Sequence, residues 1–180
     1  MRILLVGGSK SSKSGLAQRL AILLARGQKK YYWATMEPTD GEDRERIAKH
    51  LIDRGGLGFE TIERGRDLGA AQPLPEGAVV LFDSVTALLA NEMFGEVFDE
   101  KAPIKALGEL MELSRSVRDI ICVCDEIFMG GEEYGDWTLK YVRGLAFVCR
   151  GLAAEFDTVC EVVCGVPRIV KGELPEGFEL

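Results

Sequence analysis

The sequence lacks any long apolar run. Its first residues, MRILLVGG, hold only a short apolar stretch before two glycines, which is too short for a signal peptide. No later run approaches the roughly 20 residues that a helix needs to cross a bilayer. These absences predict a cytoplasmic protein without stable membrane insertion.

The sequence is also poor in positive charge. It has 22 lysines and arginines against 29 aspartates and glutamates, which gives a formal net charge of -7. Binding to a nucleic-acid backbone requires a basic face, because its affinity comes largely from counterion release. We therefore expect no nucleic-acid partner, and any anionic ligand has to be held locally.

Cysteine and histidine are scarce, with five and one in the chain. Cys122 and Cys124 alternate along an apparent strand, and Cys160 and Cys164 flank another; neither spacing supplies the four convergent ligands of a zinc site. An odd number of cysteines without a secretory signal favours reduced thiols. We expect them to pack as small hydrophobic residues rather than to bind metal or take part in redox chemistry.

What is present predicts one α/β domain over residues 1–180. The chain is near the commonest single-domain length, and 47% of its residues are apolar. Short β-rich runs alternate with longer helical stretches, as in a mainly parallel sheet. Glycine-rich segments after Gly55 and Met129 predict surface loops. Strands are predicted at 2–6, 30–35, 79–82, 120–124, 158–163 and 168–171, and helices at 13–26, 42–54, 84–94, 104–117 and 138–155.

The first predicted strand runs into GGSKSSKS and then into a helix, which is nearly the phosphate-binding pattern GxxxxGK[ST]. That pattern wraps backbone N–H groups around phosphate oxygens, and it adds a lysine for the terminal phosphates and a hydroxyl for Mg²⁺. Lys13 and Ser14 supply the last two. Ser12 replaces the second glycine, so a residue with a side chain has to adopt a conformation that glycine takes more easily. The alternative is an ordinary serine-rich turn.

A second acidic element follows at Asp83, which ends the apolar run VVLF. It is placed like a Walker B aspartate, the residue that holds Mg²⁺ or its water shell against nucleotide phosphates. The alternative role is an N-cap for the helix that begins near Val85, because Asp and Ser both cap helices well.

The single histidine, His50, lies on a predicted helix between Arg46 and Arg54. The spacing of four residues on either side places all three side chains on one helical face. Two guanidinium groups beside an imidazole would suit a nucleophile that handles phosphate. A lone histidine can equally be a surface or capping residue.

Taken together, these motifs resemble the cobinamide kinase and cobinamide-phosphate guanylyltransferase family. Members carry a GGxRSGKS-type loop, a YxAT segment, RIxxH, a downstream arginine, a glutamate after a short strand and a D/E-CxTxxxxN element. The corresponding residues here are GGSKSSKS, Tyr32-Trp33-Ala34-Thr35, Arg46-Ile47-Ala48-Lys49-His50, Arg54, Glu63, and Asp83-Ser84-Val85-Thr86 with Asn91. The similarity extends from residue 1 to about residue 170.

The resemblance implies a P-loop NTPase-like three-layer α/β/α sandwich, commonly assembled as a trimer. It also implies a kinase that phosphorylates adenosylcobinamide with ATP or GTP, and a guanylyltransferase in which GTP guanylylates His50 before GMP passes to the corrinoid phosphate. Lys13, Arg46 and Arg54 would assist His50, and Ser14 with Asp83 would hold Mg²⁺. The residues expected to line the nucleotide site are Gly7, Gly8, Ser9, Lys10, Ser11, Ser12, Lys13, Ser14, Ala34, Thr35, Met36, Leu51, Ile52, Asp53, Arg54, Glu63 and Asp83.

Further departures from the family pattern fall near the expected acceptor side. The family's NEVGxG is DEIFMG here, which keeps Glu126 and begins with Asp125, and Cys149 stands where asparagine is usual. Two alternatives therefore stay open: a nucleotide-binding regulatory or assembly protein that has lost catalysis, and a P-loop kinase for another small hydroxylated substrate. No motif that reads the base chooses between ATP and GTP as the kinase donor.

Overall fold

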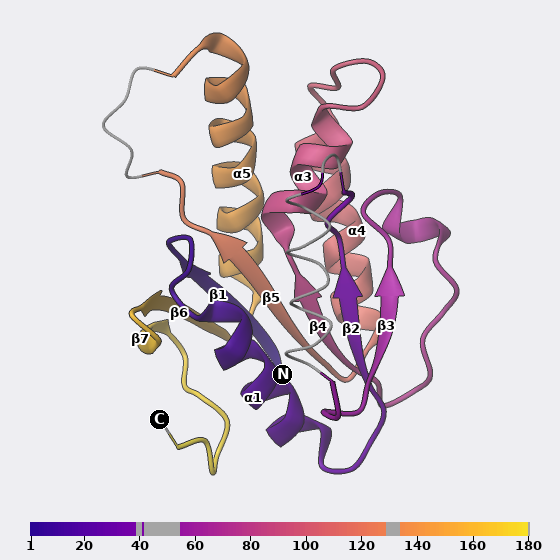
Figure 1. The fold of residues 1–180 in the computed structure, drawn as a ribbon, viewed down its shortest axis with the longest axis vertical. Helices are drawn as coiled ribbons and strands as arrows, with labels where there is room; N and C mark the ends of the chain where they lie inside the picture. Colours follow the sequence, from indigo (N-terminus) through magenta and orange to yellow (C-terminus); the bar gives the residue numbers. More distant parts are fainter. Residues whose placement is uncertain (39–40, 42–54, 129–133, 180) are drawn as a thin grey trace.

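The computed structural model describes residues 1–38, 41, 55–128 and 134–179. Its centre is a seven-stranded sheet in the order β3-β2-β4-β5-β1-β6-β7 (Figure 1). All neighbouring strands from β3 to β6 are parallel, and only β7 pairs antiparallel. The strands are β1 Arg2–Gly7, β2 Lys30–Ala34, β3 Phe59–Glu63, β4 Val79–Asp83, β5 Asp119–Asp125, β6 Thr158–Val163 and β7 Val166–Lys171.

Helices cover both faces of the sheet. Helix α1, Lys13–Ala25, packs on one face through an apolar stripe that includes Leu16 and Leu20. Helices α3 (Val85–Met93), α4 (Ala102–Ser116) and α5 (Asp136–Glu155) cover the other face, beside the short 3-10 helix η1 (Leu68–Ala70) (Figure 1). The predicted three-layer α/β/α sandwich is therefore confirmed.

The central strands are apolar because both of their faces are covered. Val79, Val80, Leu81 and Phe82 of β4 are all fully buried, and alternate residues belong to the clusters on opposite faces. Strand β5 is built in the same way. This double burial fixes the ends of β4 and β5, and with them the residues that follow at the carboxyl edge of the sheet.

Most predicted elements are present, with small shifts at their ends. Helix α4 begins at Ala102 rather than 104, because Pro103 lies in its first turn, where its missing N–H costs no hydrogen bond. The last strand begins at Val166 rather than 168. The loop predicted after Gly55 is wrong over β3, an edge strand whose side chains are largely solvent-facing and so lack a strong apolar pattern. The predicted helix 42–54 lies outside the described residues.

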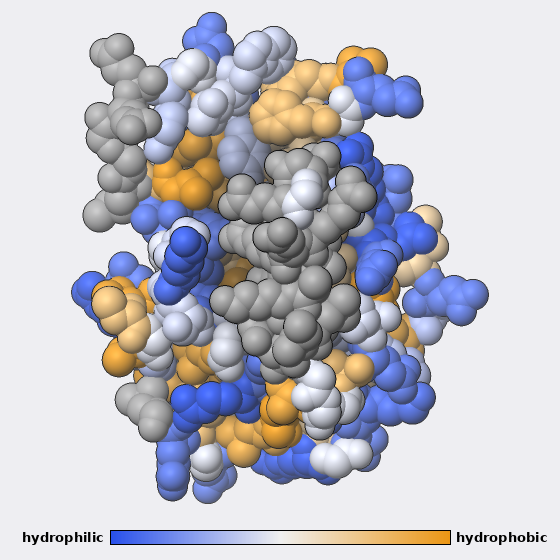
Figure 2. Space-filling model, viewed as in Figure 1, coloured by the Kyte–Doolittle hydropathy of each residue, from blue (hydrophilic) through white to orange (hydrophobic). Residues whose placement is uncertain are grey.

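Apolar side chains are also exposed around one end of the helical face. They include Phe94, Val97, Ile104, Trp137 and Phe147, from the α3–α4 connection and from α4 and α5. Figure 2 shows apolar surface at the top of the molecule in this region. Within the described residues, no helix has both the length and the apolar composition needed to cross a membrane.

Candidate functional site

The register of the parallel strands brings several predicted site residues to one edge of the sheet. Gly7 at the end of β1 pairs with Asp125 at the end of β5. Ala34 at the end of β2 pairs with Asp83 on one side and with Glu63 on the other. The carboxyl ends of β1, β5, β4, β2 and β3 therefore lie at a common edge, where open α/β sheets bind their ligands.

The phosphate loop folds around its own lysine. Lys13 is only 6% exposed, and its Nζ donates to the Gly8 carbonyl oxygen at 2.7 Å and lies 3.5 Å from Ser11 Oγ. Helix α1 begins at Lys13, and its N-cap residue Ser12 makes no side-chain capping bond. The positive end of α1 and the ammonium group therefore face the same loop, as an anion site requires.

Close backbone packing holds the first glycine of the loop in place. A Cβ at Gly7 would lie 2.4 Å from the Val162 carbonyl oxygen and 2.9 Å from Ser11 Oγ, so a side chain does not fit without displacing β6. On the same side, the Gly165 N–H donates to the Ser11 carbonyl oxygen at 3.0 Å. The β6–β7 turn thus supports the loop from outside.

Ser12 adopts the conformation that glycine takes more easily. Its φ and ψ are 67° and 22°, in the left-handed region, and Lys10 nearby also has a positive φ of 59°. A residue with a Cβ pays roughly 1–2 kcal/mol for this region. The sequence-based expectation for Ser12 is therefore confirmed. Helix α1 still begins directly after Ser12, although the usual glycine is absent.

Asp83 points at the phosphate loop. Its Oδ2 accepts hydrogen bonds from Ser14 Oγ at 2.8 Å and from the Tyr32 hydroxyl at 2.7 Å. Helix α3 is capped instead by Ser84, whose Oγ accepts from the Ala87 N–H at 3.2 Å. The capping alternative for Asp83 is therefore wrong, and its carboxylate lies beside the hydroxyl expected to bind Mg²⁺.

Asp125 is a further candidate site residue, which the sequence reasoning missed. Its Oδ1 lies 2.9 Å from Lys13 Nζ, and its backbone N–H donates to Thr86 Oγ1 at 2.8 Å. The next residue, Glu126, donates its N–H to the Gly7 carbonyl oxygen at 2.8 Å. The signal was present, because Asp125 ends an apolar run just as Asp83 does.

Thr35 is buried and holds the end of β4. Its Oγ1 donates to the Ser84 carbonyl oxygen at 2.8 Å and accepts from the Ser84 N–H at 2.7 Å, while its own N–H donates to the Asp83 carbonyl oxygen at 3.1 Å. Asn91 Nδ2 in turn donates to the carbonyl oxygens of Thr35 and Gly65. Thr35 therefore positions Asp83 and offers no group to solvent.

The remaining predicted nucleotide-site residues are spread along the edge. Ala34 and Met36 are half-buried on either side of Thr35, and Glu63 is exposed at the end of β3. Four strand spacings separate β3 from β1, or about 19 Å. Glu63 and the phosphate loop are therefore too far apart to contact one phosphate group. His50 lies outside the described residues, as do Arg46, Leu51, Ile52, Asp53 and Arg54.

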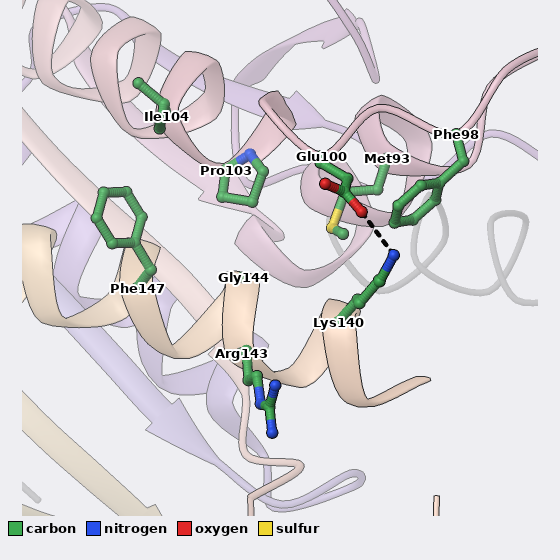
Figure 3. A pocket seen from close by; sticks show the side chains of 9 residues that line it. All are labelled: Met93, Phe98, Glu100, Pro103, Ile104, Lys140, Arg143, Gly144 and Phe147. Atoms are coloured by element: carbon green, nitrogen blue, oxygen red, sulfur yellow. Dashed lines mark hydrogen bonds and ion pairs between the residues drawn. The ribbon is translucent and has the colours of Figure 1, made fainter. Parts of the chain in front are cut away.

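An apolar pocket of about 410 Å³ lies on the helical face, between the α3–α4 connection and α5 (Figure 3). Gly144 lets α5 approach closely, because a Cβ there would lie 2.8 Å from Pro103 Cγ. Lys140 reaches across the pocket to Glu100 at 2.5 Å. None of the residues that line the pocket is among the predicted nucleotide contacts. The lining residues are Met93, Phe98, Glu100, Pro103, Ile104, Lys140, Arg143, Gly144 and Phe147.

Solved structures with a similar fold include a flagellar protein and an ATPase domain. The flagellar accessory protein FlaH from Methanocaldococcus jannaschii aligns with a TM-score of 0.50 and 18% identity, over 96% of this chain and 78% of its own. The ATPase domain aligns with a TM-score of 0.54 and 9% identity, over 89% of this chain and 68% of its own. At these identities the likeness concerns the fold alone.

Sequence comparison is more specific. The bifunctional adenosylcobalamin biosynthesis protein CobP of Pseudomonas aeruginosa is 31% identical over an alignment that covers 96% of this chain and 99% of that protein. Residues 3–170 match the family described as cobinamide kinase / cobinamide phosphate guanyltransferase (CobU). With the phosphate loop, Asp83 and the parallel sheet in place, this chain belongs to the cobinamide kinase / cobinamide phosphate guanyltransferase family.

Proposed function

We propose that this protein phosphorylates adenosylcobinamide with ATP or GTP, and then transfers GMP from GTP to adenosylcobinamide phosphate through a guanylylated His50. Family membership supports the pair of reactions. The observation that carries the proposal is the joint placement of Lys13, Ser14 and Asp83 at one phosphate loop. An ordinary serine-rich turn would not bury a lysine beside two acceptors and a strand-end carboxylate.

The loop residues have separable roles toward a triphosphate. Backbone N–H groups at the start of α1 donate to phosphate oxygens, and Lys13 brings a full positive charge to the terminal phosphates. In the kinase reaction the acceptor hydroxyl attacks the terminal phosphorus, and the bond to the bridging oxygen breaks. Lys13 would stabilise the charge that spreads over the transferring oxygens.

The residues beside the loop fit a magnesium ion. Ser14 and Asp83 offer a hydroxyl and a carboxylate 2.8 Å apart, which are hard oxygen donors of the kind that Mg²⁺ takes while it keeps several waters. Among the described residues, no three His, Cys, Asp or Glu side chains gather as a transition-metal site would require. Bound there, Mg²⁺ would neutralise negative charge on the phosphates.

The guanylyl step is proposed from the sequence and the family. An imidazole nitrogen of His50 would attack the α-phosphorus of GTP, pyrophosphate would leave, and a phosphate oxygen of the corrinoid would then displace His50 from GMP. Neutral imidazole is a competent nucleophile near neutral pH, and covalent catalysis divides one difficult displacement into two. Arg46 and Arg54 would stabilise the transferring phosphate from either side.

Intact mass after incubation with GTP and Mg²⁺ tests this proposal. We expect one added GMP, labile in acid and stable in alkali, together with release of pyrophosphate. His50→Ala should abolish the adduct and guanylyl transfer while GTP binding and phosphorylation of the acceptor continue, because the phosphate loop does not depend on the nucleophile. Arg46→Ala and Arg54→Ala should each slow adduct formation.

Two results would contradict parts of the proposal. If wild-type protein binds GTP normally but gains no mass and releases no pyrophosphate, the guanylyltransferase step is wrong. If the adduct forms yet adenosylcobinamide is never phosphorylated by ATP or GTP, the kinase step is wrong. A parallel assay with a panel of small hydroxylated acceptors would then identify a different substrate class.

A further inference from the structure

Two cysteine thiols from different elements are in contact on the α5 side of the sheet. Cys124, on β5, and Cys149, on α5, have their Sγ atoms 3.3 Å apart. Cys124 is fully buried, whereas Cys149 is only partly so. The sequence shows them 25 residues apart and gives no sign of this contact. Their pairing goes beyond the packing role expected for cysteines here.

The two thiols differ in pKa and in exposure. The hydrogen bond with Cys124 lowers the pKa of the Cys149 thiol, although burial opposes this. The same hydrogen bond, together with burial, raises the pKa of Cys124. The thiolate is the form that reacts with oxidants, and the partly exposed Cys149 is the one that an oxidant can reach. Cys124 is then in position to attack an oxidised Cys149.

Cys124 is also connected to Lys13 by a short chain of contacts. Its Sγ lies 3.6 Å from Thr86 Oγ1, and that oxygen accepts the Asp125 N–H at 2.8 Å. Asp125 Oδ1 is 2.9 Å from Lys13 Nζ. A displacement of Cys124 therefore acts on the residue whose carboxylate lies against the phosphate-binding lysine.

We propose that Cys149 and Cys124 form an oxidisable dithiol, and that its disulfide weakens nucleotide binding at the phosphate loop. The oxidant is a hydroperoxide. The Cys149 thiolate attacks the terminal peroxide oxygen, the O–O bond breaks, and Cys149 becomes a sulfenic acid, while the departing hydroxide or alkoxide takes a proton from solvent and leaves as water or an alcohol. Cys124 sulfur then attacks Cys149 sulfur, the S–O bond breaks, and water leaves with the Cys124 proton.

Closure of this bond requires movement near the loop. The sulfurs in a disulfide are about 2.05 Å apart, so the two atoms have to approach each other by more than an ångström. Movement of the Cys124 sulfur by this amount changes its 3.6 Å contact with Thr86 Oγ1. The hydrogen bond that fixes the Asp125 backbone is then weakened, so its carboxylate leaves its place against Lys13 while keeping its negative charge near the bound phosphates.

The covalent step is tested in a Cys164→Ser background, which removes the exposed thiol and leaves four. The reduced protein is treated with hydrogen peroxide, denatured and alkylated. Before alkylation, we expect an intact mass lower by two hydrogen atoms. After alkylation, we expect two thiols to remain unmodified and one peptide to link Cys124 to Cys149. Adding Cys149→Ser should remove the link, and Cys124→Ala serves where that variant is poorly folded.

Failure of the covalent step has a clear signature. Retention of all four alkylatable thiols under peroxide, stable over-oxidation of Cys149 alone, or a link to Cys122 would each overturn the proposal. Because this readout needs no nucleotide, it stands apart from the proposed kinase and guanylyltransferase reactions.

The coupling is tested by calorimetry with GTP and Mg²⁺ on the same protein. Oxidised protein should bind about fivefold more weakly than reduced protein, and dithiothreitol should restore the affinity, while the Cys149→Ser variant should respond to neither treatment. A disulfide that forms without changing GTP affinity would overturn the coupling to the loop. Reduced protein that binds no GTP would instead contradict the proposed function.

Discussion

Strands β4 and β5 lie side by side, and each ends in an aspartate that contacts the phosphate loop. Asp83, after the apolar run of β4, accepts hydrogen bonds from two neutral hydroxyls, those of Ser14 and Tyr32. Asp125, after the apolar run of β5, lies against the ammonium group of Lys13 at 2.9 Å. The two carboxylates have similar places in the sheet but different partners.

Because their partners differ, the two carboxylates should affect nucleotide binding differently. The two hydroxyls that contact Asp83 carry no charge, so its negative charge suits a cation that arrives with the nucleotide. The charge of Asp125 is already opposed by Lys13, the residue that the phosphates also require. A triphosphate that arrives with Mg²⁺ therefore gives Asp83 a cation to bind. The same triphosphate competes with Asp125 for Lys13. Substitutions at the two positions should accordingly act in opposite directions.

The largest effect is expected from Asp83→Asn. The amide keeps the size of the side chain but removes the charge, so both phosphoryl and guanylyl transfer in Mg²⁺ should fall by about 100-fold or more. GTP affinity should fall when Mg²⁺ is present and change little in EDTA. Titration of Mg²⁺ against pyrophosphate release and GTP binding measures both.

A matched control for Asp83 is Tyr32→Phe. This variant removes one hydroxyl from the carboxylate and leaves the charge, so its loss of activity should be smaller by at least about tenfold. Equal losses in both variants would mean that the orientation of Asp83, and not its charge, decides the rate.

Lys13→Ala should weaken GTP binding by more than about tenfold, because it removes the only full positive charge that the described loop buries. It also leaves the Asp125 carboxylate unopposed near the phosphates. Lys13→Ala with Asp125→Asn should therefore bind GTP better than Lys13→Ala alone. Lys29→Ala, at an exposed lysine outside the loop, is the control for loss of one positive charge. Calorimetry that finds unchanged affinity for Lys13→Ala would remove the phosphate-loop assignment.

Asp125→Asn should have a smaller effect of opposite sign. Without the carboxylate, Lys13 no longer has to be shared, and one repulsive charge near the phosphates is lost, so GTP should bind about two- to fivefold more tightly. The gain should shrink as salt is raised. Asp125→Glu, which keeps the charge, should show no gain. Weaker binding in Asp125→Asn would indicate that the ion pair mainly holds Lys13 in position.

Much of this site could be predicted because its signals are local in the sequence. The loop with Lys13 and Ser14 follows the end of β1, and Asp83 lies at the end of β4. Apolar runs locate strand ends well when both faces of the strand are buried. Asp125 carried the same signal and was missed because only its departure from a family pattern was considered. Strand β3 was missed for a different reason, since an exposed edge strand has no such run.

Contacts between distant segments could not be predicted in this way. The Cys124–Cys149 contact depends on how α5 packs on β5, and Thr35 and Asn91 meet only because α3 begins beside the end of β2. Sequence spacing predicts which face of its own helix or strand a residue occupies. It does not state which residue of another element lies opposite.

The smallest effect is expected at Ser12, where the backbone and not a charge is altered. Ser12→Gly removes the Cβ from a left-handed conformation with φ of 67° but makes the unfolded chain more flexible. The net result should be a gain of about 0.5–1 kcal/mol in the free energy of unfolding, or a rise of about 1–4 °C in Tm. GTP affinity should be kept or improved, because the loop reaches the same geometry with less strain. Ser12→Ala retains the Cβ and loses the hydroxyl, so it should show no gain. A large loss of GTP affinity in both variants would mean that the Ser12 hydroxyl itself contacts the nucleotide, and a loss in Ser12→Gly alone would mean that the loop needs the restriction that serine imposes.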